Sequence, residues 1–151
     1  MSEVKNILLV GVGGQGTILA SKILTSGLIE AGYEVKMSEI HGMSQRGGSV
    51  STQVRFGEKV YAPMIGEGQA DVIVAFEKME ALRALPYLKK NGKMVVNDFE
   101  IPSMPIITGA AEYPQGIIEN LNANADILTV KAGETADELG NDKAMNVVLL
   151  G

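Results

Sequence analysis

The sequence predicts an α/β fold in which helices cover both faces of a mainly parallel sheet. Apolar segments of strand length alternate along the chain with segments of helical periodicity, an order that produces parallel strands joined by right-handed crossovers. Segments 7–10, 72–75 and 94–96 are unbroken apolar runs, as central strands buried on both faces require. The first run leads directly into a glycine-rich turn and a helix. These observations predict one Rossmann-like domain that spans residues 1–151.

The first half of the chain contains most of the predicted strands. A helix over 15–31 has an apolar face and ends at Gly32. Residues 49–56 alternate between apolar and polar side chains, which is typical of a half-buried strand. A Gly-Glu turn then returns the chain as 59–62, the second arm of an antiparallel hairpin. The other strands predicted in this half are 33–38 and 70–76.

The second half alternates shorter helices and strands. A helix over 77–88 has apolar residues on one side and precedes a turn at Asn91 and Gly92. A proline near its first turn favours a helix over 114–121. We expect a short strand at 106–107 and the beginning of an apolar helix in 142–151. The remaining predicted elements are strands at 93–97 and 126–130 and a helix at 134–139.

Composition excludes several classes of function. The net charge of −5 and the absence of tryptophan argue against a nucleic-acid-binding surface. The sequence has neither a membrane-spanning apolar run nor a signal-peptide pattern, so we expect a cytoplasmic protein that does not enter a membrane. Without cysteine the chain forms no disulfide and ligates no iron–sulfur cluster by thiolates. With His41 as its one histidine, it has no histidine-rich metal site.

The glycine turn after the first strand is the first candidate site. Gly11, Gly13 and Gly16 form the pattern G-x-G-x-x-G, and Gly14 adds a fourth glycine. Such a turn allows a phosphate close to the backbone, and the backbone N–H groups of the next helix favour an anion. The candidate cofactor-binding residues are Gly11, Gly13, Gly14, Gln15, Gly16 and Thr17. Alternatively, the glycines only allow the helix to pack closely on the strand.

A dinucleotide site would also require an acidic residue that binds a ribose at the end of the second strand. Glu39 is the nearest candidate. It begins a second distinctive segment, 39–49, which we expect at the carboxyl edge of the sheet, close to the glycine turn. Arg46 offers a planar guanidinium suited to carboxylate or phosphate. The candidate residues for a partner or active-site edge are His41, Ser44, Gln45, Arg46, Gly47 and Gly48. The alternative is a solvated polar loop.

Catalytic patterns are otherwise missing from the sequence. Glu77 begins a predicted helix, where interaction with the helix dipole is favoured over a catalytic role. No serine lies in a G-x-S-x-G elbow, and Lys22 comes too late for a P-loop. The sequence therefore indicates a ligand-binding or partner-binding domain without a reaction centre of its own.

Three motifs in one order resemble the gamma-type subunit of 2-oxoacid:ferredoxin oxidoreductases. They are Gly-Val-Gly-Gly-Gln-Gly-Thr at 11–17, Glu-Ile-His-Gly-Met-Ser-Gln-Arg-Gly-Gly-Ser-Val at 39–50, and Ala-Phe-Glu at 75–77 with Glu-Ala-Leu at 80–82. The central motif is the most specific of the three. The indolepyruvate type, in which this chain is called the beta subunit, resembles the sequence most closely.

The resemblance implies a non-catalytic subunit of a larger enzyme. That enzyme converts a 2-oxoacid, such as indolepyruvate or pyruvate, and coenzyme A to acyl-CoA and CO2, and it passes electrons to ferredoxin. The implied cofactors of the complex are thiamine diphosphate, magnesium, iron–sulfur clusters and coenzyme A, none of them held by this chain alone. The implied partners are a thiamine-binding subunit and an iron–sulfur-bearing subunit. The usual thiamine diphosphate motif, which begins Gly-Asp-Gly, is absent here.

Further expectations follow from the same resemblance. Residues 11–16 and 45–48 would lie at an edge near the active site, where they help to receive coenzyme A. Members of the family continue through a further helical region, so we expect that 1–151 is a C-terminally shortened domain. Two other readings stay open. One is a stand-alone nucleotide-binding protein, although adenylating enzymes with a similar glycine pattern need further arginines and often zinc-binding cysteines. The other is a pure scaffold subunit that binds no small molecule.

Overall fold

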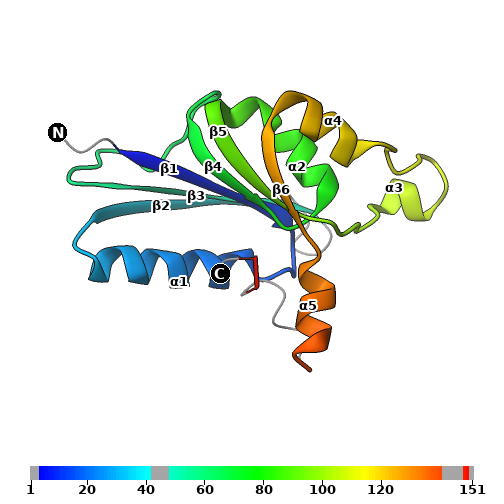
Figure 1. Cartoon of the computed structure of the whole chain (residues 1–151), viewed down its shortest axis with the longest axis horizontal. Helices are drawn as coiled ribbons and strands as arrows, with labels where there is room; N and C mark the ends of the chain where they lie inside the picture. The colour runs from blue at the N-terminus through cyan, green and yellow to red at the C-terminus, as the bar shows by residue number, and fades with distance from the viewer. Residues whose placement is uncertain (1–3, 42–47, 141–147, 150–151) are drawn as a thin grey trace.

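The computed structural model describes residues 4–41, 48–140 and 148–149. Its centre is a six-stranded sheet with the strand order β2-β3-β1-β4-β5-β6 (Figure 1). The strands are β1 (Lys5–Val12), β2 (Glu34–His41), β3 (Ser49–Gly57), β4 (Ala70–Ala75), β5 (Leu88–Asn97) and β6 (Asp126–Val130). The helices are α1 (Thr17–Glu30), α2 (Lys78–Ala84), the 3-10 helix η1 (Leu85–Tyr87), α3 (Met104–Ile107), α4 (Ile117–Asn124) and α5 (Ala132–Glu138).

Five of these strands point the same way and one opposes them. β1 pairs parallel to β4, β4 to β5 and β5 to β6, whereas β3 is antiparallel to both of its neighbours, β1 and β2. The connection from β2 to β3 spans only 42–48, which is too short to cross over and begin a parallel strand. The predicted α/β fold with an antiparallel portion is therefore confirmed, and the three predicted central strands lie in β1, β4 and β5.

The two faces of the sheet are covered by different helices. α1 packs on β1, β2 and β3, while α2 and α4 lie on the opposite side, as Figure 1 shows. The core on the α1 side includes Leu9, Val54 and Phe76, all fully buried. The core on the other side includes Ile73, Met94 and Leu121. Within the described ranges, the helices are all too short or too polar to cross a lipid bilayer.

The predicted hairpin after β3 is wrong. Residues 59–62 form no strand, and the antiparallel partners of β3 are β1 and β2. Because β3 already pairs along both of its edges, a further hairpin arm has no edge on which to form. Instead, segment 58–69 lies against the sheet, with Ile65 buried in the core on the α2 side.

Several other boundaries differ from the prediction. The expected strand at 106–107 is part of helix α3, which has Pro105 in its first turn. β5 begins at Leu88 rather than 93 and continues through Asn91, which adopts a φ of 68° where the register with β4 shifts. The helix predicted over 77–88 divides into α2 and η1. Most of the helix expected in 142–151 lies outside the described residues, although Leu149 is helical and buried in the α1-side core.

Candidate functional site at the carboxyl edge of the sheet

The carboxyl ends of β1 and β4 meet where the chain leaves the sheet in opposite directions. β1 leads into α1 on one face, and β4 leads into α2 on the other. The amide of Phe76, just after β4, donates a hydrogen bond of 2.8 Å to the carbonyl of Val10 in β1. In open α/β sheets, such a point of reversal is where ligands bind. The candidate site therefore has the position that its fold class favours.

The glycines of the turn have different structural roles. A Cβ on Gly11 would lie 2.9 Å from Gln15 Oε1 and 3.0 Å from Phe76 Cβ, so this glycine is required for close packing. Gly14 is exposed and adopts a φ of 98°, and no heavy atom lies within 4 Å of the position of an added Cβ. Gly16 is the left-handed N-cap of α1, with a φ of 81°. Thus packing explains Gly11, whereas Gly14 faces open space.

The side chain of Gln15 points into the protein. Its Oε1 accepts a hydrogen bond of 2.8 Å from the amide of Val12, and its Nε2 donates one of 2.8 Å to the carbonyl of Phe76. The buried side-chain amide of Asn97 donates a hydrogen bond of 3.0 Å to the same carbonyl. Gln15 therefore joins the turn after β1 to the end of β4. Thr17 is also buried.

The second motif meets the glycine turn through Gly48, the last of its candidate site residues. The amide of Gly13 donates a hydrogen bond of 2.9 Å to the carbonyl of Gly48. At the other end of the motif, His41 is exposed at the end of β2, with its Nε2 3.6 Å from Glu39 Oε2. The intervening candidates Ser44, Gln45, Arg46 and Gly47 lie outside the described residues. The two motifs that the sequence singled out are thus joined by at least one backbone contact.

Glu39 does not occupy the position of a ribose-binding acid. It lies in β2, opposite Thr52 of β3, and β3 separates it from β1. Two strand spacings of about 4.8 Å each therefore lie between β2 and the strand that enters the glycine turn. A dinucleotide site of the usual kind has its second strand next to the first. The sequence could not reveal this separation, because it depends on where β3 pairs.

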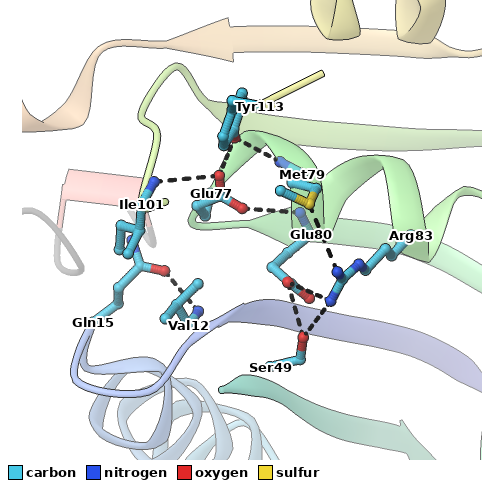
Figure 2. A network of polar contacts seen from close by, with 9 residues as sticks. All are labelled: Val12, Gln15, Ser49, Glu77, Met79, Glu80, Arg83, Ile101 and Tyr113. Carbon is cyan, nitrogen blue, oxygen red and sulfur yellow. Dashed lines mark hydrogen bonds and ion pairs between the residues drawn. The ribbon is translucent and has the colours of Figure 1, made fainter. Parts of the chain in front are cut away.

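Glu77 is the centre of a polar network that the motifs did not predict (Figure 2). Its side chain, with 1% of its surface exposed, caps α2 by accepting a hydrogen bond of 3.1 Å from the amide of Glu80. It also accepts hydrogen bonds from the hydroxyl of Tyr113 and, at 3.4 Å, from the amide of Ile101. The expected place of Glu77 at a helix start is confirmed. Its contacts with residues 24 and 36 positions away are new.

Burial raises the pKa of Tyr113, and its hydrogen bond to Glu77 raises it further. The tyrosine hydroxyl therefore remains protonated and donates to the carboxylate. The neighbouring Lys78 holds the same region of the chain, since its Nζ lies 2.6 Å from Glu100 Oε1 and 3.5 Å from Asp98 Oδ1. Together, Glu77 and Lys78 fix segment 98–113 to the beginning of α2.

A second carboxylate lies one helical turn further along α2. Ser49 Oγ donates a hydrogen bond of 2.9 Å to Glu80 Oε1, and Arg83 Nη1 lies 3.2 Å from the same oxygen (Figure 2). Burial raises the pKa of Glu80, whereas Ser49 and Arg83 oppose that shift. The only local sequence signal for this group was the spacing of two glutamates at the first turn of a helix. Ser49 comes from β3 and could not be assigned to it from the sequence.

These contacts define what the edge can do chemically. The carboxylates of Glu77 and Glu80 are engaged by protein donors, so they position backbone segments. In the part of the chain that the structure describes, His, Asp and Glu nowhere form a group of three that could hold a metal ion. Of the predicted cofactor-binding residues, Gly14 is the exposed one, so the prediction of an anion site concerns mainly its backbone.

Comparison with known protein families agrees with this geometry. Residues 6–151 match the family described as pyruvate ferredoxin/flavodoxin oxidoreductase. The chain belongs to this family. The resemblance that the sequence motifs predicted is thereby confirmed, and the match covers both the sheet and its carboxyl edge.

Relatives in this family include indolepyruvate oxidoreductase subunits. The chain is 46% identical over 151 residues to subunit IorB of Pyrococcus horikoshii and 45% identical to that of Thermococcus kodakarensis. Each alignment covers 97% of this chain and 74% of the relative. The identity to the pyruvate synthase subunit PorC of Methanosarcina barkeri is 25%. The sequence is therefore much nearer to the indolepyruvate proteins than to this pyruvate synthase subunit.

Solved structures share the fold at lower identity. The gamma subunit of a keto/oxoacid ferredoxin oxidoreductase from Geobacter sulfurreducens has a TM-score of 0.66 and 22% identity over 97% of this chain and 73% of that one. The 2-oxoglutarate:ferredoxin oxidoreductase of Magnetococcus marinus, solved with 2-oxoglutarate, coenzyme A and succinyl-CoA, has a TM-score of 0.70 and 21% identity. The match covers 95% of this chain but 23% of that one, so there the fold is one part of a longer polypeptide.

Proposed function

We propose that this chain is the gamma-type, non-catalytic subunit of a 2-oxoacid:ferredoxin oxidoreductase that acts on indolepyruvate or a similar 2-oxoacid. The observation that carries the proposal is the 46% identity, over 97% of the chain, to an indolepyruvate oxidoreductase subunit. Membership of the family further supports it. The partners of this chain would be the subunits that bind thiamine diphosphate and iron–sulfur clusters, and ferredoxin would interact with the assembled complex.

Most of the cofactors that this reaction needs would be held by the partner subunits. The complex would release the carboxylate of the 2-oxoacid as CO2, transfer the acyl group to the thiol of coenzyme A, release the thiol proton and pass an electron pair to ferredoxin. Thiamine diphosphate supplies carbanion stabilisation, and iron–sulfur clusters carry the electrons. The chain has no cysteine to ligate a cluster. Its contribution would be to shape the site and to help bind a substrate.

We propose that a phosphate of coenzyme A binds at the glycine turn. Gly14 is exposed, and its backbone conformation leaves the space above it open. The amides of Gly13 and Gln15 already donate to Gly48 and Val12. The proposed contact therefore centres on the Gly14 backbone at the start of α1, with Gly11, Gln15 and Thr17 supporting the turn from beneath. The segment 41–48, including Arg46, stays a predicted partner or active-site edge.

The two alternative functions, a stand-alone nucleotide-binding protein and a pure scaffold subunit, differ in what they require of the glycine turn. A stand-alone dinucleotide-binding protein is disfavoured, because β3 separates Glu39 from the glycine turn. A pure scaffold subunit would use the turn for packing alone. The place of Gly14, exposed at the carboxyl edge of the sheet, favours a ligand over that reading, since ligands of open α/β sheets bind at this edge.

The proposal is tested by reconstitution. The purified chain, supplied with thiamine diphosphate, magnesium, coenzyme A, indolepyruvate and an electron acceptor, should produce no acyl-CoA. Addition of the partner subunits should restore turnover, and the partners without this chain should be markedly less active. Acyl-CoA formation measured by chromatography is the readout. Turnover by the chain alone, or full activity of the partners without it, would contradict the proposal.

A further inference from the structure

Among the described residues, β2 and β3 have a helix on only one face. α1 covers β2 and β3 from one side, whereas on the other side α2 packs on β1, β4 and β5 (Figure 1). Val35 and Met37 of β2 face α1, so by strand alternation Lys36, Ser38 and Ile40 project to the opposite face. Sheets of α/β proteins normally have helices on both faces. The face opposite α1 is therefore available to another element at Lys36 and Ile40 of β2, whereas segment 58–69 partly covers it at β3, where Gln53 is buried.

This open face contains a groove with an apolar floor and a polar rim. The groove has a volume of about 280 Å³ and lies between β3, β1 and α2. Leu8, Val10 and Ala84 form its floor, and Ser49, Ser51 and Arg83 lie among the residues of its rim. Its size suits one or two side chains of a partner rather than a whole cofactor.

Exposed apolar side chains occur at the edge of the groove and on segment 58–69. Ile40 at its edge is 47% exposed, and Met64 and Tyr61 on the neighbouring segment are 58% and 88% exposed. That segment is fixed to the same face, because the amide of Ile65 donates a hydrogen bond of 2.9 Å to Gln53 Oε1 in the groove. Exposed apolar side chains beside a groove with a polar rim are consistent with a protein interaction site.

The charged groups of this face include three cations and two carboxylates, those of Glu34 and Glu80. Arg83 has 59% of its side chain exposed beside the groove, although it pairs with Glu80. On β2 and the adjoining segment, Lys36 and Lys59 share one carboxylate, Glu34, at 3.9 Å and 4.0 Å. This local excess of cations contrasts with the net charge of −5 of the whole chain. It favours an acidic partner over a second copy of this chain.

We propose that this open face, defined by Ile40, Ser51, Met64 and Arg83, binds an acidic amphipathic helix of a partner subunit. The inference rests on the proposed function, since it assumes that the chain assembles into a multisubunit enzyme. An apolar side chain of the helix enters the groove, and a carboxylate of the helix pairs with Arg83. The helix then covers the exposed side of β2 and the groove beside β3.

The test uses the full chain and the partner subunits of the complex. Ile40→Glu and Met64→Glu each place a carboxylate on the open face, at positions exposed enough to tolerate it. Each variant should weaken association with the partners by roughly tenfold or more, measured by calorimetry or sedimentation. The matched control is Leu19→Glu on α1, which is 54% exposed and lies on the other side of the sheet. It should change the affinity by less than about threefold.

The possible results separate this inference from the proposed function. If the wild-type chain assembles into an active complex and both glutamate variants assemble equally well, the open face is not the docking surface, although the proposed function stands. If the wild-type chain does not join any complex, the proposed function itself fails. If Ile40→Glu instead abolishes a homodimer of the wild-type chain, the face joins two copies and the inference is wrong. Arg83→Gln should in addition reduce the dependence of the affinity on salt concentration.

Discussion

At the scale of single residues, the most informative group is the buried carboxylate of Glu77. It receives hydrogen bonds from the start of α2 and from two positions in segment 98–113. A buried carboxylate needs such donors, because the loss of one leaves its charge partly unsatisfied. Glu77 thus links the end of β4 to a distant segment of the chain.

Replacing Tyr113 should show how much the stability of the fold depends on the donors to Glu77. Tyr113→Phe removes the hydroxyl donor but retains the ring, so the free energy of unfolding should fall by about 1–3 kcal/mol. Urea denaturation monitored by circular dichroism is the measurement. Tyr61→Phe is the control, because Tyr61 is 88% exposed and its change should be within about 0.5 kcal/mol. Equal effects of both substitutions would mean that the bond to Glu77 contributes nothing measurable.

Glu80 should make stability depend on pH. Burial raises the pKa of Glu80 above its ordinary value of 4.5, so the folded chain retains a proton that the unfolded chain has already lost. As the pH rises from this ordinary value through the raised pKa, the contribution of Glu80 to stability therefore decreases. The wild-type chain should lose stability relative to Glu80→Gln over this range.

Urea denaturation at a series of pH values measures that difference. Glu138→Gln, at an exposed position on α5, controls for the removal of one negative charge. The free energy by which the wild-type chain is more stable than Glu80→Gln should decrease, or change sign, as the pH increases. A difference that grows with pH would show that Ser49 and Arg83 outweigh burial.

At the scale of elements, the glycine turn combines packing and exposure within a few residues. Gly11 permits the contact between β1, Gln15 and Phe76, whereas Gly14 is exposed with a positive φ. Gly32, after the far end of α1, provides a matched position. It has a φ of 96° against 98° for Gly14, and at both positions an added Cβ meets nothing within 4 Å.

Comparison of alanine at these two positions tests the turn as a ligand site. Gly14→Ala and Gly32→Ala should lose similar stability, on the order of 1–2 kcal/mol, because each places a Cβ at positive φ. Only Gly14→Ala should raise the KM for coenzyme A in the reconstituted complex, by roughly tenfold, since it obstructs close approach to the backbone. If both variants keep the wild-type KM, the turn serves packing alone.

At the scale of the whole molecule, the position of β3 decides what the site can be. By pairing between β1 and β2, β3 moves Glu39 away from the glycine turn. The same arrangement brings Gly48 against Gly13 and Ser49 against Glu80, so the second motif and α2 meet at one edge. The topology therefore disfavours a dinucleotide-binding site of the usual kind.

The sequence by itself determined the α/β class, the central strands and the two motifs of the carboxyl edge. These features depend on local patterns, since unbroken apolar runs require burial on both faces and glycines permit a tight turn after a strand. Tertiary structure alone decided how β3 pairs, why 59–62 forms no strand, and which partners Glu77 and Glu80 acquire. Those outcomes depend on contacts between residues far apart in the chain, such as Ser49 with Glu80 and Glu77 with Tyr113. Local periodicity does not predict such contacts.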